Sequence, residues 1–150
     1  MKKLSDVYFL ACASNTADIY KIDNKPDYVE SNNIIWFAEN IYMYLESMFQ
    51  EKLRINSWFR NKELNTKVGG SPTSRHLEGM AIDFTVEGEN VRHVAMNIFM
   101  AIPSFGKMII YPNHNFIHLD SKFTNEKLIY VTYDKKNYER ISYDDIYEIL

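Results

Sequence analysis

The sequence predicts an α+β fold, in which a small antiparallel sheet carries helices packed on one side. Two observations lead to this class. Runs that alternate apolar and polar residues are interspersed with stretches whose apolar residues recur every three or four positions. The 150 residues, 46% hydrophobic and 25% charged, have the size and composition of one globular domain. No repeat or linker divides them, so we expect residues 1–150 to form a single domain.

The N-terminal third is expected to hold one long helix. Residues 1–30 are polar and are expected to be irregular, with a turn at residues 23–26. Over residues 33–50 the apolar side chains recur at steps of three and four, which is typical of a helix that buries one face. Ser31 or Asn32 can cap this helix at its N-terminus.

Strands and a second helix are expected to follow. Residues 53–58 and 80–86 alternate apolar and polar side chains, as half-buried strands do. Between these strands lie a polar segment, residues 61–67, and a compact Gly-Gly-Ser-Pro loop, residues 69–72. From residue 88 to Pro103, apolar residues again recur at helical spacing.

The C-terminal third predicts a hairpin and two further elements. Residues 107–111 and 116–120 are strand-like and flank Pro112-Asn113-His114-Asn115, which is typical of a hairpin connection. A further strand is expected over residues 128–133, and a short terminal helix over residues 143–150.

Charge and composition exclude several classes of protein. Lys and Arg total 17 against 20 for Asp and Glu, so the net charge of -3 argues against a nucleic-acid partner. No apolar stretch approaches the ~18 residues of a membrane span. The apolar run Val7–Cys12 is too short for a signal peptide, so we expect synthesis in the cytoplasm without a leader. The single cysteine, Cys12, excludes a disulfide framework and leaves four histidines and the carboxylates as metal ligands.

Two histidines and a carboxylate are the best candidates for a metal site. His76 lies on the loop that enters one predicted strand, and Asp83 lies on that strand. His118 lies on the later hairpin strand, where period two places it on the same face as Asp120. Three such ligands leave a fourth position open, as in catalytic zinc sites. Spacing of this kind is a weak signal by itself, because any protein with four histidines offers some such triple, and hydrogen-bonded core histidines are the alternative.

Two ordered motifs resemble the zinc D-Ala-D-Ala carboxypeptidase family. The first comprises Ile55-Asn56-Ser57-Trp58-Phe59-Arg60, the segment Val68-Gly69-Gly70-Ser71-Pro72-Thr73-Ser74, and then His76, Gly79, Ala81 and Asp83. The second is Phe116-Ile117-His118-Leu119-Asp120. The resemblance covers about residues 8–125, with its motif core at about 55–120. This family includes phage endolysins and murein endopeptidases, and it shares its fold with the Hedgehog signalling domain.

The resemblance implies a set of site residues. His76, Asp83 and His118 would bind Zn²⁺. Arg60 matches the family arginine that polarises the scissile carbonyl or holds a substrate carboxylate, although a surface ion pair is the alternative. Ser74 would either hydrogen-bond near the site and contact substrate, or cap the loop.

The general base departs from the family pattern. Many relatives carry Glu or Asp three residues before the last ligand, or His two before it, whereas this sequence has Asn115 and Phe116. Asp120 is the candidate base, and its alternative role is to support a ligand histidine through a hydrogen bond. His114 is a further candidate for base or substrate contact, or else an exposed loop residue.

The resemblance also implies a function: hydrolysis of an amide bond in bacterial peptidoglycan peptides by metal-activated water. The stretch around residues 14–26 is similar to phage members, so we expect a monomeric endolysin-type endopeptidase. It would be made in the host cytoplasm and act on the wall after release. The alternatives are a D,D-carboxypeptidase that trims terminal D-Ala, and a non-catalytic zinc-binding structural or wall-recognition module of a phage particle.

Overall fold

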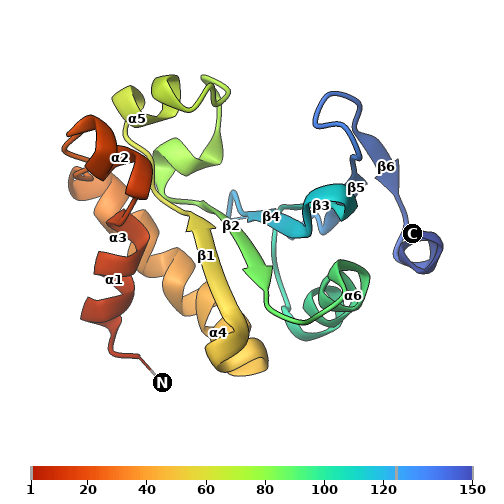
Figure 1. Cartoon of the computed structure of the whole chain (residues 1–150). Helices are drawn as coiled ribbons and strands as arrows, with labels where there is room; N and C mark the ends of the chain where they lie inside the picture. The colour runs from red at the N-terminus through yellow and green to blue at the C-terminus, as the bar shows by residue number, and fades with distance from the viewer. Residues whose placement is uncertain (1, 124, 150) are drawn as a thin grey trace.

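The computed structural model describes residues 2–123 and 125–149, and within them six strands form one sheet, ordered β1-β2-β4-β3-β5-β6 (Figure 1). The strands are β1 (Leu53–Ser57), β2 (Ala81–Val86), β3 (Lys107–Tyr111), β4 (Phe116–Asp120), β5 (Leu128–Val131) and β6 (Glu139–Ile141). All neighbours are antiparallel except β3 and β5, which run parallel. The α+β class is therefore confirmed, and the parallel pair is the one departure from the expected antiparallel sheet.

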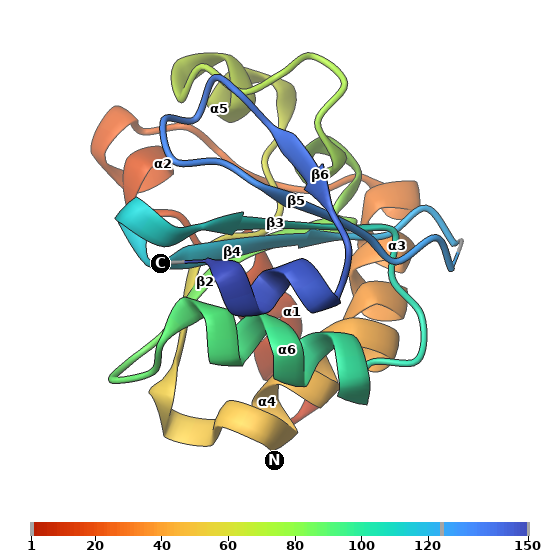
Figure 2. The ribbon, with the colours of Figure 1, turned by 90° about the vertical axis from the view of Figure 1, so that its right-hand side faces the viewer.

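The helices are α1 (Leu4–Cys12), α2 (Asn15–Tyr20), α3 (Tyr28–Phe37), α4 (Met43–Phe49), α5 (Lys62–Lys67) and α6 (Val91–Ala101). Figure 2 shows α1, α4 and α6 on one side of the sheet. Since successive residues of a strand alternate between faces, Ile82, Ile117 and Leu119 point to that side and are buried there. Asp83 and His118 consequently face the opposite side. No described helix has the length and apolar character needed to cross a membrane.

The expectation of an irregular N-terminus is wrong. Residues 4–12 form α1, residues 15–20 form α2, and α3 begins at Tyr28. Helix α1 has no side-chain cap, but Val7 and Ala11, four residues apart on one face, are fully buried. A nine-residue helix is marginal alone, so the packing of α1 against α3 stabilises it. That contact joins distant parts of the chain and is invisible in local periodicity.

The long helix begins earlier than predicted. Its cap is Asp27, not Ser31 or Asn32: the Asp27 side chain accepts from the Glu30 backbone, and the Glu30 carboxylate accepts from the Asp27 N–H. This capping box satisfies two otherwise unpaired N–H groups. The helix continues through a π-helical stretch, Ala38–Tyr42, into α4 and ends at Phe49.

The remaining elements largely match the predicted ones. Strands β1 to β4 and α6 lie where the sequence predicts them, whereas β5 ends two residues early, at Val131. The polar segment after β1 is helix α5, capped by the Asn61 side chain. Strand β6 was not predicted. The terminal helix is a 3-10 helix, Asp144–Glu148, and residue 150 of the predicted range lies outside the described residues.

Candidate metal centre

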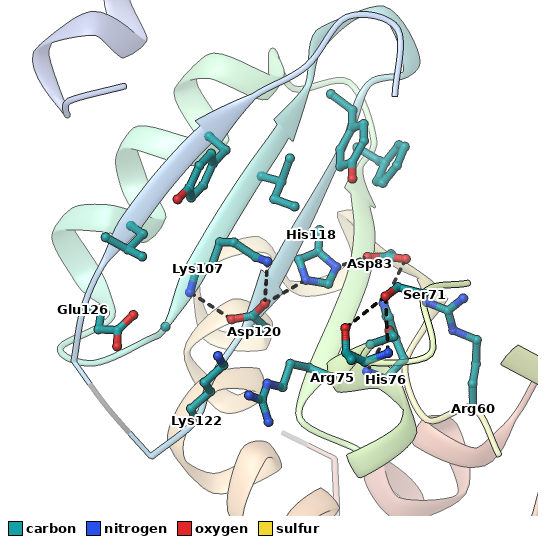
Figure 3. A pocket seen from close by; sticks show the side chains of 18 residues that line it. Arg60, Ser71, Arg75, His76, Asp83, Lys107, His118, Asp120, Lys122 and Glu126 are labelled. Carbon is teal, nitrogen blue, oxygen red and sulfur yellow. Dashed lines mark hydrogen bonds and ion pairs between the residues drawn. The ribbon is translucent and has the colours of Figure 1, made fainter. Parts of the chain in front are cut away.

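A cleft of about 540 Å³ opens on the face of the sheet that the core helices leave free. Its floor comes from β2, β3, β4 and β5, and one wall comes from the segment between α5 and β2. The cleft is lined by Arg60, Ser74, His76, Asp83, His118 and Asp120, together with other polar and aromatic residues. Six of the seven residues that the sequence nominates for the site therefore lie together, and Figure 3 labels all of these except Ser74.

The three candidate ligands converge on one point of this cleft. The β2–β4 register pairs Asp83 with His118, and His118 Nδ1 lies 2.8 Å from Asp83 Oδ1. His76 Nε2 lies 3.2 Å from Asp83 Oδ2. One ligand atom from each of the three residues falls within 4.8 Å of the others, so together they can hold a metal ion.

His76 is oriented by the backbone around it. A short 3-10 helix, Arg75–Glu78, carries it, and the Ser74 hydroxyl accepts from the His76 N–H at 3.3 Å. His76 Nδ1 lies 2.6 Å from the Trp58 carbonyl oxygen. Since that oxygen only accepts, Nδ1 carries the proton and Nε2 keeps its lone pair.

The His76 Nε2 atom is the observation that fits a metal ion. It is buried and has no hydrogen-bond partner among the described residues. Its lone pair instead faces the Asp83 carboxylate, an arrangement that is repulsive unless a cation lies between them. Two imidazoles and one carboxylate are donors that zinc accepts in catalytic sites, where a fourth position stays open.

His118 is held between two carboxylates. Its Nδ1 faces Asp83, and its Nε2 lies 3.1 Å from Asp120 Oδ2. Burial alone would lower the pKa of His118, but the hydrogen bonds to Asp120 and Asp83 raise it to about 9. Burial would raise the pKa of Asp83, yet His76 and His118 lower it. Asp83 is thus ionised at neutral pH.

Asp120 is almost completely buried, at 3% exposure. Its Oδ1 accepts from the Lys107 backbone N–H at 2.9 Å, and its Oδ2 also lies 3.7 Å from Lys107 Nζ (Figure 3). Sequence reasoning missed Lys107. The signal lay in the hairpin, because strand pairing places Lys107 beside Asp120 on the same face.

Arg60 lies at the edge of the cleft near Asp83. Its backbone N–H donates to the His76 carbonyl at 3.0 Å, which ties it to the loop of the first ligand. Burial lowers the pKa of its guanidinium, and the charge of Asp83 opposes that change. Its Nε atom is buried and unpartnered within the described part of the chain. A guanidinium in this position is available to an anionic or carbonyl oxygen of a ligand.

His114 is the one nominated residue that the structure does not bring to the site. It ends the 3-10 turn Pro112–His114 between β3 and β4, is exposed, and does not line the cleft. The imidazole ring of His114 packs in a T-shaped arrangement against the ring of Phe116, with the two ring centroids 6.4 Å apart. The turn therefore directs this side chain away from the metal centre.

The protein has an α+β fold with a mostly antiparallel sheet, and a cleft on this sheet holds a His-Asp-His set. This arrangement is that of a metallopeptidase-like centre. Comparison with protein families identifies Peptidase M15 over residues 14–120. The chain belongs to the Peptidase M15 family, and it is a zinc-dependent metallopeptidase that acts on a peptide substrate. The expected family is confirmed. Among curated proteins, no sequence match was found.

Proposed function

We propose that this protein hydrolyses an amide bond in the peptides of bacterial peptidoglycan, with zinc held by His76, Asp83 and His118. The buried, unpartnered lone pair of His76 Nε2, beside Asp83, carries this proposal. Zinc bound there supplies a Lewis acid that polarises a carbonyl and activates water at neutral pH. The two motifs around His76 and His118 support the choice of a wall peptide as substrate.

Arg60 is the residue that we assign to the reacting carbonyl. Hydrolysis of an amide builds negative charge on the carbonyl oxygen, and positioned donors that stabilise this charge accelerate the reaction. The guanidinium of Arg60 lines the cleft beside the ligand set with its Nε unpartnered, and the residue is held by the backbone bond to His76. Ser74 acts through His76, because its hydroxyl caps the turn that presents the imidazole.

The lining of the cleft supports a peptide with small apolar groups and carboxylates. Ile109, Leu128 and Tyr130 form an apolar stretch of its floor, and the stacked rings of Tyr111 and Phe116 extend it, with centroids 4.1 Å apart. The cationic side chains of Arg60, Arg75, Lys107 and Lys122 also line it. Stem peptides of peptidoglycan present both alanine methyls and free carboxylates. The net charge of -3 offers no general attraction to an anionic wall, so recognition falls to this cleft.

We further propose an endolysin-type role. The similarity of residues 14–26 to phage members supports it. In this role the protein is made in the cytoplasm of the host, works as a monomer, and reaches the wall after release through the membrane.

Digestion of purified peptidoglycan tests the function. The wild-type protein, with about one zinc per chain, should release muropeptides, and His76→Ala should lose both zinc and release. Mass spectrometry separates the outcomes: loss of a single alanine indicates a carboxypeptidase, whereas separation of two stems indicates an endopeptidase. Hydrolysis by a zinc-free protein would overturn the mechanism.

A non-catalytic zinc-binding module of a phage particle is the second candidate. It is favoured by one observation, the absence of an acid three residues before His118, where Asn115 stands. A protein that holds zinc but releases no product from any peptidoglycan would establish this alternative.

A further inference from the structure

The Asp120 carboxylate has both of its oxygen atoms engaged. Oδ1 accepts from the Lys107 N–H at 2.9 Å, and Oδ2 pairs with His118 Nε2 at 3.1 Å. From this geometry we infer that Asp120 is a positioning residue: it holds the His118 ring so that Nδ1 presents its lone pair to the metal. The inference rests on the metal site of the proposed function, and it assigns Asp120 to ligand orientation instead of proton transfer.

Both ring nitrogens of His118 face a carboxylate, Nδ1 toward Asp83 and Nε2 toward Asp120. A metal ion held together with Asp83 would replace the proton on Nδ1, and the remaining proton of a neutral His118 would then lie on Nε2, where it donates to Asp120. The lone pair then resides on Nδ1, which faces Asp83 and the His76 side of the cleft. A carboxylate on the far nitrogen of a ligand histidine typically strengthens metal binding 10–100-fold.

The backbone beside Asp120 is built to accommodate its carboxylate. Gly106 donates its N–H to the Asp120 carbonyl at 2.8 Å. A Cβ added to Gly106 would lie 2.9 Å from Asp120 Oδ1 and 3.3 Å from the carbonyl oxygen. The φ of Gly106 is not positive, so its conformation does not require glycine. Glycine fits at position 106 because the Asp120 carboxylate occupies the space that a Cβ would take.

A water-activating base needs an oxygen that is free to accept a proton. Both oxygens of Asp120 already have a partner: Lys107 N–H donates to Oδ1, His118 and the more distant Lys107 Nζ face Oδ2, and only 3% of the residue is exposed. These contacts favour a fixed carboxylate over one that exchanges protons with substrate. The same contacts also set the direction in which the His118 ring points.

Two variants test the inference through metal binding. Asp120→Asn replaces one of the two acceptor oxygens by an NH₂ group, so either Lys107 N–H or His118 Nε2–H then faces a donor. Gly106→Ala keeps the carboxylate but displaces it. Each variant should raise the zinc dissociation constant about 10-fold or more, measured by competition with a chromogenic chelator. Each should also alter the visible spectrum of the cobalt-substituted protein.

Asp134→Asn is the matched control, because Asp134 is a hydrogen-bonded turn carboxylate outside the cleft. It should leave zinc affinity unchanged, and circular dichroism should confirm that all three variants fold. NMR of ¹⁵N-labelled zinc protein should show the His118 proton on Nε2. The inference is overturned if Asp120→Asn keeps its zinc affinity and cobalt spectrum but loses turnover, since Asp120 would then be the base. It is also overturned if Gly106→Ala leaves both unchanged. Failure of the wild-type protein to bind zinc would instead refute the proposed function.

Discussion

His118 Nδ1 lies 2.8 Å from Asp83 Oδ1, across the β2–β4 pair, while the other nitrogen of the same ring faces Asp120. Both nitrogens of His118 therefore favour a bound proton, and its pKa is raised to about 9. A metal ion must displace the proton from Nδ1 before this residue can act as a ligand.

Zinc affinity is consequently expected to increase with pH. Below pH 9 the metal-free His118 is protonated, whereas Asp83 is ionised and His76 is neutral at pH 7 because the pKa values of both are lowered, so neither has to lose a proton to bind the metal. The apparent association constant should rise about tenfold per pH unit from 7 to 9 and then level off. Calorimetry in buffers of different ionisation enthalpy should count about one proton released per zinc at pH 7. A pH-independent affinity would contradict the arrangement around His118.

Replacement of Arg60 should separate catalysis from metal binding. We expect Arg60→Met to lower kcat about 10²-fold, because donors to a developing oxyanion contribute on that scale. Zinc content should not change, since Arg60 is not among the ligand group. Arg54→Met is the control: Arg54 on β1 pairs with Glu87, the residue after β2, away from the cleft. Unaltered turnover of peptidoglycan by Arg60→Met would remove Arg60 from the reaction.

Gly79 and Gly69 offer a matched pair for stability. Their φ values are +74° and +71°, so alanine at either position costs about 1–2 kcal/mol in backbone conformation. At Gly79 a Cβ would also lie 2.5 Å from Ile34 Cγ1, whereas at Gly69 it meets nothing within 4 Å. Gly79→Ala should therefore lower the free energy of unfolding by about 1–3 kcal/mol more than Gly69→Ala. Urea denaturation measures the unfolding free energies of both variants. Equal decreases would show that Ile34 of α3 moves aside without an energetic cost.

Asn24 ties its own loop to two other backbone segments, at Cys12 and at residues 59–61. Its amide donates to the Cys12 and Phe59 carbonyls at 3.1 and 2.9 Å, and its oxygen accepts from the Asn61 N–H at 2.8 Å. Asn24→Ala should destabilise the protein by about 2–4 kcal/mol, because partly buried groups lose their partners.

The control for Asn24 is Asn40→Ala, which removes one exposed hydrogen bond, to Trp36. Its expected change in unfolding free energy is within about 0.5 kcal/mol. Thermal or urea unfolding of both variants makes the comparison. Similar stabilities would mean that the three bonds of Asn24 are replaced by water without cost.

Sequence reasoning succeeded where the pattern is local or the motif is ordered. Period-two alternation correctly placed Asp83 and His118 on strands, and placed His118 and Asp120 on one face. The motif resemblance nominated His76, and the structure brings it to the other two ligands. Sequence reasoning did not predict helix α1. Only two of its nine residues are buried, and two residues give a weak periodic signal when the helix that they pack against is not known.

The sequence alone determined the α+β class, the strands at the centre of the sheet and the identity of the candidate ligands. Alternation of side chains and motif order are properties of neighbouring residues and survive without the fold. Tertiary structure decided that Asp120 contacts the far nitrogen of His118, that Lys107 and Gly106 enclose its carboxylate, and that His114 lies outside the cleft. These relationships depend on strand register and turn geometry, which set the contacts between residues that no local pattern connects.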